Sequence, residues 1–303
     1  MFTFHLSSHL SSPVRGGVAL CWILLAMALA AQAQTKASCT FNFFAPTTPF
    51  KLPDGTPVFI DPVGINDFGT IVGHTSPPTA HRGLIRFADG RVTAVKGTKF
   101  LMARNDRGTS VGLDWKFRGV LVHGTTVTPI ILDVNNGGVD PFGINNSSTV
   151  VGFYVNPNLV GIHGFKRFNN GTTHTLDFPG ALATQPSSIN DNGAVVGDYN
   201  AADGSLHGFI FHNGHWATLD YPHASDTFLV GITNTGKIIG NAFLPGPHVR
   251  IQPFLYENGT FKVISVPTSG STPSLMSVSP KQGLILGVKD NIPGDPAFIA
   301  KCQ

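Results

Sequence analysis

The chain has 303 residues, with 20 Lys and Arg against 17 Asp and Glu and a formal net charge of +3. This balance is close to neutral and no dense basic patch interleaves with aromatic residues, so the sequence argues against nucleic acid as a partner. Of the 17 acidic residues, 16 are Asp and only Glu257 is Glu, beside 35 Gly and 22 Pro. This composition argues against a mainly helical protein and is typical of short strands joined by tight turns.

Residues 1–33 have the pattern of an export signal. Arg15 supplies the charge, residues 17–30 supply an apolar run, and Ala31-Gln32-Ala33 is the small-x-small motif that a signal peptidase cleaves. A membrane anchor is the alternative, but the run is shorter than the roughly 20 residues that cross a bilayer. We therefore expect a secreted protein, periplasmic or extracellular, whose remaining chain 34–303 has no membrane span.

Two cysteines remain after this cleavage. Cys21 is removed with the leader, whereas Cys39 and Cys302 stand near the two ends of the remaining chain. In the oxidising setting of an exported protein, this arrangement predicts one disulfide bond between them. Two unpaired thiols are the alternative.

A motif of about ten residues recurs along the chain 34–303. Its first copy is Gly64-Ile65-Asn66-Asp67-Phe68-Gly69-Thr70-Ile71-Val72-Gly73, and further copies occupy 143–152, 188–197 and 231–240, with degenerate copies at 103–112 and 277–287. The closing glycines are 39, 40, 45, 43 and 47 residues apart. Asn-Asp-x-Gly is typical of a turn in which Asn or Asp accepts backbone hydrogen bonds and Gly takes a positive φ, so the motif predicts two antiparallel strands.

A second signature follows each copy of the motif. It is clearest as His163-Gly164-Phe165 with Asn170-Gly171, and as His207-Gly208-Phe209 with Asn213-Gly214. Weaker copies begin at residues 82, 118, 253 and 296. Because Asn-Gly between apolar alternations is a strong hairpin signal, each unit is predicted to contain four antiparallel strands.

Six such units predict an all-β fold, a six-bladed β-propeller formed as one domain by residues 34–303. A repeat of about 43 residues fits four-stranded blades, whereas the coils of a β-solenoid usually need about 20 to 30. A two-sheet sandwich is the other alternative. A solenoid would also need polar end caps, which the sequence does not show.

The two ends of the chain are predicted to meet in the last blade. The sixth unit ends at its third strand, residues 298–301, and lacks a fourth. Residues 40–46 resemble 175–179 and 218–222, which are fourth strands of earlier units. Placing 40–46 beside 298–301 sets Cys39 opposite Cys302, so the N-terminal strand completes the last blade and the disulfide replaces a hairpin turn.

At these motifs the chain resembles the bacterial extracellular repeat family called HAF, named for a His-Ala-Phe tripeptide that follows Gly-Ile-Asn-x-x-Gly-x-Val-Val-Gly. The resemblance covers about residues 58–300. It departs from the family pattern where Gly164 and Gly208 replace Ala and where Arg82 and Arg118 replace His. The resemblance implies an exported repeat protein of uncharacterised role and supplies no catalytic residue.

The sequence predicts no catalytic, cofactor-binding or metal-binding residue. There is no Gly-x-Ser-x-Gly nucleophile elbow, because the stretch around Ser205 has His in the wrong place. Glycine-rich phosphate loops are absent too. Four histidines, His207, His212, His215 and His223, fall within 17 residues and suggest zinc or copper if a third ligand joins two of them. A solvated hairpin tip is the favoured interpretation.

Other candidate residues follow from the repeat itself. His163 and His207 recur at one position, as do Asn66, Asn105, Asn145, Asn190 and Asn234, and recurrence favours a structural role. Asp177 and Asp220 are equivalent acids of adjacent units, and outer fourth strands are their expected place. Functional candidates are instead positions where the repeat is broken, namely Arg104 and Ser279-Pro280.

We therefore expect a non-catalytic exported scaffold, monomeric, that binds a protein or a glycan through its funnel or rim. The alternative is a carbohydrate-active propeller enzyme, a glycoside hydrolase or lyase. A binding module predicts exposed aromatic side chains such as Trp115 or Trp216 at the channel mouth. An enzyme predicts converging Asp and His side chains with perturbed pKa values.

Overall fold

A computed structural model describes residues 35–44, 50–52, 55, 57–75, 82–132, 138–155, 161–248, 250–267, 272–289 and 296–303. The predicted leader lies outside these residues, and residues 34–303 form one compact unit. The described residues form strands and turns and no helix, so among them no helix could cross a membrane. The all-β prediction is therefore confirmed.

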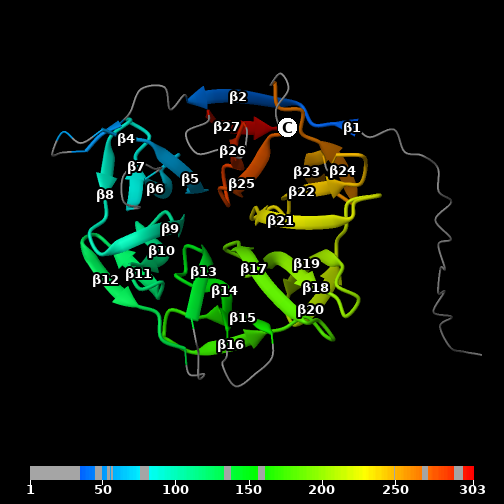
Figure 1. The fold of residues 1–303 in the computed structure, drawn as a ribbon, viewed down its shortest axis with the longest axis horizontal. Helices are drawn as coiled ribbons and strands as arrows, with labels where there is room; N and C mark the ends of the chain where they lie inside the picture. Colours follow the sequence, from blue (N-terminus) through cyan, green and yellow to red (C-terminus); the bar gives the residue numbers. More distant parts are fainter. Residues whose placement is uncertain are drawn as a thin grey trace, which may run out of the picture. The chain divides into compact units, whose positions relative to one another are not determined.

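Most strands fall into four-stranded antiparallel groups, which we label units 1 to 6 for reference (Figure 1). Units 3, 4 and 5 belong to one 13-stranded sheet. Unit 1 contains β5 (Ile60–Ile65), β6 (Ile71–Thr75), β7 (Gly83–Arg86) and β8 (Val92–Ala94), and unit 2 contains β9 (Thr98–Arg104), β10 (Thr109–Asp114), β11 (Gly119–His123) and β12 (Thr126–Pro129). Unit 3 contains β13 (Gly138–Ile144), β14 (Val150–Val155), β15 (Ile162–Arg167) and β16 (Thr173–Leu176), and unit 4 contains β17 (Ala183–Ile189), β18 (Val195–Asn200), β19 (Leu206–His212) and β20 (His215–Thr218). Unit 5 contains β21 (Asp226–Ile232), β22 (Ile238–Leu244), β23 (Arg250–Glu257) and β24 (Thr260–Val263), and unit 6 contains β25 (Ser274–Val278), β26 (Leu284–Val288), β27 (Ala297–Cys302) and β2 (Cys39–Phe44).

The repeated motif forms the first hairpin of each unit in the way its residues predict. In unit 1, Asn66 Oδ1 accepts hydrogen bonds from the backbone N–H groups of Phe68 (3.1 Å) and Thr70 (2.9 Å). Gly69 has a φ of 69°, a left-handed conformation that glycine adopts without strain. The closing glycine lies opposite a bulge in the first strand, where a Cβ on Gly73 would lie 2.0 Å from the Asp61 carbonyl oxygen. Only glycine fits there, so the motif is a packing requirement.

The units follow one another around a common centre (Figure 1). The first strand of each unit contacts the first strand of the next, in the order β5, β9, β13, β17, β21 and β25, and β25 contacts β5. Strand hydrogen bonding does not form a continuous circle. Single parallel bridges join unit 3 to unit 4 and unit 4 to unit 5, whereas units 1, 2 and 6 are separate sheets.

Hydrophobic cores lie between successive units. One cluster joins units 4 and 5 through Val196, Tyr221, Leu229 and Phe254, and others join each remaining pair of neighbours. The third strands contribute equivalent, fully buried phenylalanines in four units, Phe165, Phe209, Phe254 and Phe298. Each unit therefore buries its faces against its neighbours, and burial of this apolar surface is the main favourable term in folding.

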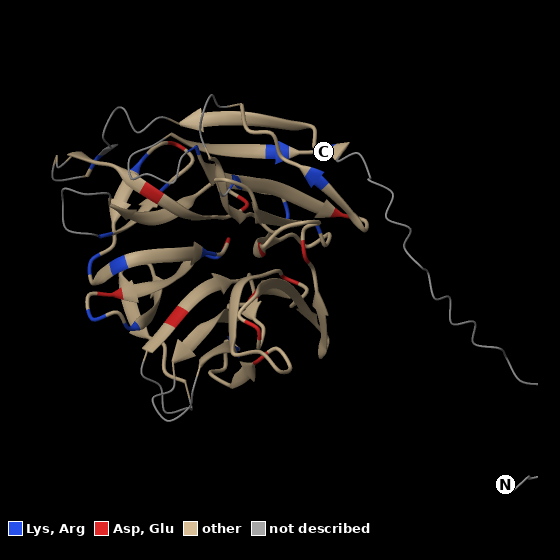
Figure 2. Cartoon of the chain, turned by 45° about the vertical axis from the view of Figure 1, so that its right-hand side comes forward, with Lys and Arg blue, Asp and Glu red and all other residues tan. Residues whose placement is uncertain are grey.

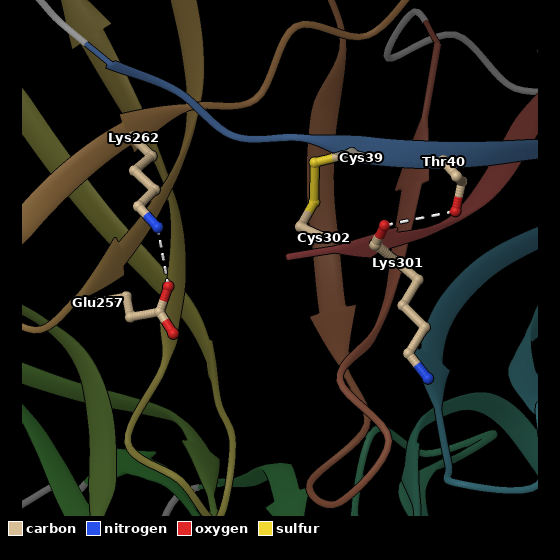
Figure 3. The surroundings of a disulfide bond; sticks show 6 residues. All are labelled: Cys39, Thr40, Glu257, Lys262, Lys301 and Cys302. Carbon is tan, nitrogen blue, oxygen red and sulfur yellow. Dashed lines mark hydrogen bonds and ion pairs between the residues drawn. A yellow bond between two sulfur atoms is a disulfide. The ribbon is translucent and has the colours of Figure 1, made fainter.

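Strand β2, near the start of the described chain, and β27, at its end, meet in unit 6, as predicted. Strand β2 pairs antiparallel with β27, and Cys39 lies directly opposite Cys302 in this register. The two cysteines form a disulfide bond with a Cα–Cα distance of 4.1 Å, which closes a sequence separation of 263 residues (Figure 3). The predicted pairing and the predicted disulfide are both confirmed.

Three features differ from the sequence-based expectation. Strand β1 (Thr35–Lys36) pairs in parallel with β24 and extends unit 5, and β3 (Phe50–Lys51) pairs with β4 (Pro57–Val58). Neither pairing carries a repeat signature. The fourth strands β16 and β20 end at Leu176 and Thr218, so Asp177 and Asp220 follow these strands instead of lying within them.

Candidate functional site

A ladder of asparagine side chains links the first turns of neighbouring units. Asn66 Nδ2 donates to the Asn105 carbonyl (3.3 Å), and Asn105 Nδ2 donates to the Asn145 carbonyl (3.0 Å). Asn145 Nδ2 donates to the Asn190 carbonyl (3.1 Å), and Asn190 Nδ2 donates to the Thr233 carbonyl (2.8 Å). All four asparagines are buried, so each bond satisfies polar groups that would otherwise be costly to bury. The recurring asparagines therefore join the units to one another.

The residues that follow these asparagines form a second series of bonds, which we call the turn belt. The backbone N–H of one turn donates to the side-chain oxygen of the next, along Asp67, Asp106, Asn146, Asp191 and Asn234, at 2.8 to 3.0 Å. The backbone N–H of Asn234 donates to the Pro280 carbonyl (2.7 Å). The backbone N–H of Lys281 then donates to Asp67 Oδ1 (2.8 Å). The turn belt thus runs from unit 1 through unit 6 and returns to unit 1.

The carboxyl groups of the turn belt have different electrostatic environments. Burial raises the pKa of Asp106, and the neighbouring Asp67 side chain adds to the rise while a hydrogen bond from Asn146 opposes it. Burial also acts to raise the pKa of Asp191, but hydrogen bonds from Asn234 and Asn146 outweigh it and hold this pKa below its usual range. Asp191 is therefore a stable carboxylate acceptor within the belt.

A cavity of about 500 Å³ lies where the first strands of the units face one another. Every unit contributes to its lining, with Val63 from unit 1, Met102 from unit 2, Phe142 from unit 3, Ser187 from unit 4, Phe228 from unit 5 and Met276 from unit 6 among the lining residues. Most lining side chains are apolar, and a few polar groups converge among them. This size and composition are those of small-molecule binding pockets.

Asp198 is an acidic side chain of this lining without a partner among the described residues. It lies on β18 directly after the closing glycine Gly197, opposite Gln185 of β17. Burial alone raises the pKa of Asp198 to about 7, and no charged group contributes. The group therefore changes its charge near neutral pH, as catalytic and ligand-binding carboxyl groups often do.

The equivalent residue of unit 5 has a structural role that Asp198 lacks. Asn241 follows the closing glycine Gly240, and its side chain donates to the Leu275 carbonyl (2.8 Å) and accepts from the Leu275 N–H (2.9 Å). A carboxylate cannot donate a hydrogen bond, and Asp198 makes neither contact with unit 5. The Leu229 carbonyl, which is the unit 5 counterpart of the Leu275 carbonyl, accepts instead from Ser187 Oγ.

Comparison with protein-family models and with curated proteins gives no match. Solved structures do match. TolB from Acinetobacter baumannii has a TM-score of 0.53 at 12% identity over 78% of this chain, which spans 65% of the length of that protein. The TolB-like protein from Agrobacterium tumefaciens has a TM-score of 0.53 at 10% identity, over 88% of this chain and 99% of that one. A subtype N11 neuraminidase-like protein has a TM-score of 0.54 at 11% identity, over 88% and 94% of the two chains.

The fold is a β-propeller. These neighbours are themselves β-propellers, and the units described above are four-stranded antiparallel blades of the same kind. Sequence identities near 10% support an inference about the fold but not about the function, because one fold supports many unrelated functions. The function of this propeller must therefore be argued from its own residues.

Both predicted breaks of the repeat border the cavity. Arg104, at the end of β9, lines it and donates from Nη1 to Ser110 Oγ (2.9 Å), and burial lowers the pKa of its guanidinium. Pro280 lines it as well, and the hydroxyl of the adjacent Ser279 accepts from the Leu284 N–H (3.0 Å). Sequence reasoning therefore located two residues of the site.

Sequence reasoning missed Asp198, although a signal for it was available. Aligning the residues that follow the closing glycines sets Asp198 against Asn241, His74 and Phe153. An acid at a position that otherwise holds an amide, an imidazole or an apolar side chain is a local break of the repeat. Its unpaired state depends on the packing of unit 4 against unit 5, which the alignment alone does not contain.

The Ser205 region contains hydrogen bonds in the order of a catalytic triad. Ser205 Oγ lies 2.7 Å from His207 Nε2, and His207 Nδ1 lies 2.7 Å from Asp220 Oδ2. The Ser205 hydroxyl also lies 2.5 Å from Asp203 Oδ1, which competes for its proton. A second His–Asp pair, His163 with Asp177 at 2.8 Å, recurs in unit 3. The His–Asp pair is therefore a repeated clamp between the third strand and the end of the fourth.

The other candidate residues lie away from the cavity lining. His212 and His215 are exposed cross-strand partners at the tip of the β19–β20 hairpin. Trp216 is half-buried against Phe211, with ring centroids 4.6 Å apart, whereas Trp115 is exposed in the β10–β11 turn. Neither tryptophan lines the channel cavity. The two tryptophans that the sequence suggested for the channel mouth are therefore not part of this cavity.

Proposed function

We propose that this chain is an exported, non-catalytic β-propeller scaffold of six blades, a divergent member of the HAF-type repeat proteins, that binds a ligand in its central channel. The observation that carries the ligand site is the cavity of about 500 Å³ lined by the first strands of every unit. Its mainly apolar wall with a few converging polar groups supports binding of a small molecule or of a side chain from a protein or glycan partner.

Several observations support a closed ring of six blades. The turn belt returns from Lys281 to Asp67, the first strands contact one another from β5 to β25 and back to β5, and the last blade is completed by β2. Radial repetition of this kind leaves only short edge strands on the outside of each blade. Because units 1 and 6 pack their apolar faces against each other, the chain needs no second copy to complete its core, and we propose a monomer.

Export is supported by the disulfide bond between Cys39 and Cys302, because such bonds persist in oxidising compartments. The periplasm or the extracellular space is the proposed location. Charges of both signs are spread over the blades, and this distribution supports a partner other than nucleic acid (Figure 2). Sequencing the N-terminus of the exported protein tests the proposal, since cleavage after Ala33 leaves Gln34 as the first residue.

A carbohydrate-active enzyme is the second candidate, favoured by the cavity-lining carboxyl group of Asp198 with a pKa of about 7. A glycosidase needs two carboxyl groups roughly 5 to 10 Å apart. The other acid of the lining is Asp106, which belongs to the turn belt and whose counterpart in unit 4 is Asp191. Asp198 lies opposite Gln185, which precedes Asp191 by six residues. Six residues at about 3.3 Å each span more than 10 Å, so these two acids of the lining are too far apart to form a glycosidase pair.

The channel site is tested by filling it. The exported protein is screened on a glycan array and with a panel of hydrolase substrates, beside a Met276→Trp variant that fills the cavity. The matched control is Ile131→Trp, because Ile131 is 72% exposed and lies outside the lining. Ligand binding that is lost only in Met276→Trp supports the proposal. Substrate turnover that Asp198→Asn abolishes would establish the enzyme instead.

A further inference from the structure

Asp198 places an uncompensated negative charge in the channel. Its carboxyl group has no hydrogen bond or ion pair among the described residues, although at the equivalent position Asn241 makes two backbone bonds. An asparagine at 198 would supply the donor and acceptor that this position uses in unit 5. The carboxylate is therefore not explained by the packing of the blades.

No cation among the described residues neutralises this carboxylate. Arg104 lines the same cavity, but it is bonded to Ser110 on unit 2. In the repeat, Arg104 occupies the position that Ile189 has in unit 4. Ile189 lies four residues beyond Gln185, and Gln185 is the cross-strand partner of Asp198. Four strand residues span about 13 Å, so the two charges lie at different levels of the channel. An isolated carboxylate in an apolar setting is unfavourable until a cation pairs with it.

Aromatic side chains lie in the same part of the cavity. Phe228 and Phe243 of unit 5 line it with ring centroids 5.1 Å apart, and Ile251 lines it beside them. Strand β21, which carries Phe228, contacts β18, which carries Asp198. Aromatic faces attract cations and also bury the apolar body of a ligand.

We infer that the channel binds an organic cation, an ammonium or guanidinium group on an apolar body, with the cationic group paired to Asp198 and the body packed against Phe228 and Phe243. This inference rests on the proposed function of the channel as a ligand site and names the class of ligand. A neutral ligand would leave the carboxylate unpaired, and an anionic ligand would be repelled by it. A free basic side chain of a protein partner has the same chemistry.

Three probes that share one apolar body test the charge requirement: 4-phenylbutylammonium, 4-phenylbutanol and 4-phenylbutyrate. Each is titrated calorimetrically at pH 8 into the exported full chain with its disulfide intact. Losing one partner of a buried charge pair costs about 2 kcal/mol or more, which is about 30-fold in affinity. We therefore expect the ammonium to bind at least about 30-fold more tightly than the alcohol, and the carboxylate to bind most weakly.

The Asp198→Asn variant tests the residue, and Asp226→Asn is its matched control. Asp226 lies on the neighbouring strand β21, outside the cavity lining, and removing it changes the net charge equally. We expect Asp198→Asn to lose the preference for the ammonium while still binding the alcohol, and Asp226→Asn to retain the preference. Unfolding curves establish that both variants are folded.

Two results would overturn the inference, and they are distinguishable. Equal binding of ammonium and alcohol by the wild-type protein, unchanged in Asp198→Asn, would leave the channel as a ligand site without cation selectivity. Binding of none of the three probes at millimolar concentration would remove the cation site. The proposed channel function would then depend on the glycan and substrate screens with Met276→Trp.

Discussion

Replacing Asp198 with asparagine is expected to stabilise the protein in a pH-dependent way. In the folded state burial raises the pKa of this carboxyl group to about 7, whereas in the unfolded chain it is about 3.9. Between these values the folded state keeps a proton that the unfolded state has released. Stability contributed by this site therefore falls as the pH rises from about 4 to about 7 and is constant above that range.

The magnitude follows from the difference between the two pKa values. One pKa unit corresponds to about 1.4 kcal/mol, so about three units correspond to about 4 kcal/mol of lost stability above pH 8. Asparagine carries no charge and avoids this loss. The stability advantage of Asp198→Asn should therefore be small near pH 4 and grow to about 4 kcal/mol by pH 8.

Other titrating groups near Asp198 do not produce the same pattern. Strand β17 carries no titratable side chain, β19 carries His207 and His212, and β21 carries Asp226. All of these groups are present in both proteins, so their effects cancel in the difference between wild type and variant. Urea unfolding at pH 4.5, 6, 7.5 and 9 measures that difference directly. A gap of equal size at pH 4.5 and pH 9 would refute the argument that an unpaired buried charge causes it.

Three further predictions concern the scaffold. Replacing Cys39 and Cys302 with alanine should lower the free energy of unfolding by roughly 5 kcal/mol on the chain-entropy estimate, and equal melting temperatures with and without the bond would contradict it. Phe117 has a φ of 58°, a left-handed conformation that is unfavourable for a residue with a Cβ. Phe117→Gly should therefore stabilise the protein by up to about 1 kcal/mol, even though it removes the contact of the ring with Lys99 Nζ at 3.9 Å. A lower melting temperature of the variant would contradict this. Asn145→Ala should lower the free energy of unfolding by about 2 to 3 kcal/mol, because it leaves buried backbone groups of two turns unpaired. Urea unfolding measures this loss, and a clearly smaller value would contradict the prediction.

The sequence predicted the parts of the fold that each unit determines by itself. Asn66 and Gly69 define the first turn, and the closing glycine Gly73 defines the bulge opposite it. These turn and bulge preferences depend on about ten consecutive residues, so the sequence of each copy predicts them. The pairing of Cys39 with Cys302 was predictable because a missing strand at one end matched a surplus strand at the other.

Other features depend on contacts between units and could not be predicted from the sequence of a single repeat. Thr35–Lys36 pairs with β24 only because unit 5 leaves its outer edge open beside the incoming chain. The turn belt also depends on how neighbouring turns meet, so recurrence of Asp67, Asp106 and Asp191 could indicate a structural role but not its bonds. The cavity arises from side chains of every unit, and no single repeat contains it.

Polar groups near the channel have two different roles: those of the turn belt stabilise the fold, whereas Asp198 belongs to the proposed ligand site. At the turns, carboxylates and carboxamides are bonded to the next unit, so Asp191 contributes to stability as a charged acceptor. At Asp198 the same chemical group has no partner in the described part of the chain, and its charge opposes folding above neutral pH. A fold joined by cores between successive units can carry such a local loss without unfolding. Because asparagine would avoid this loss, the carboxylate is best explained by a cationic ligand whose binding recovers it.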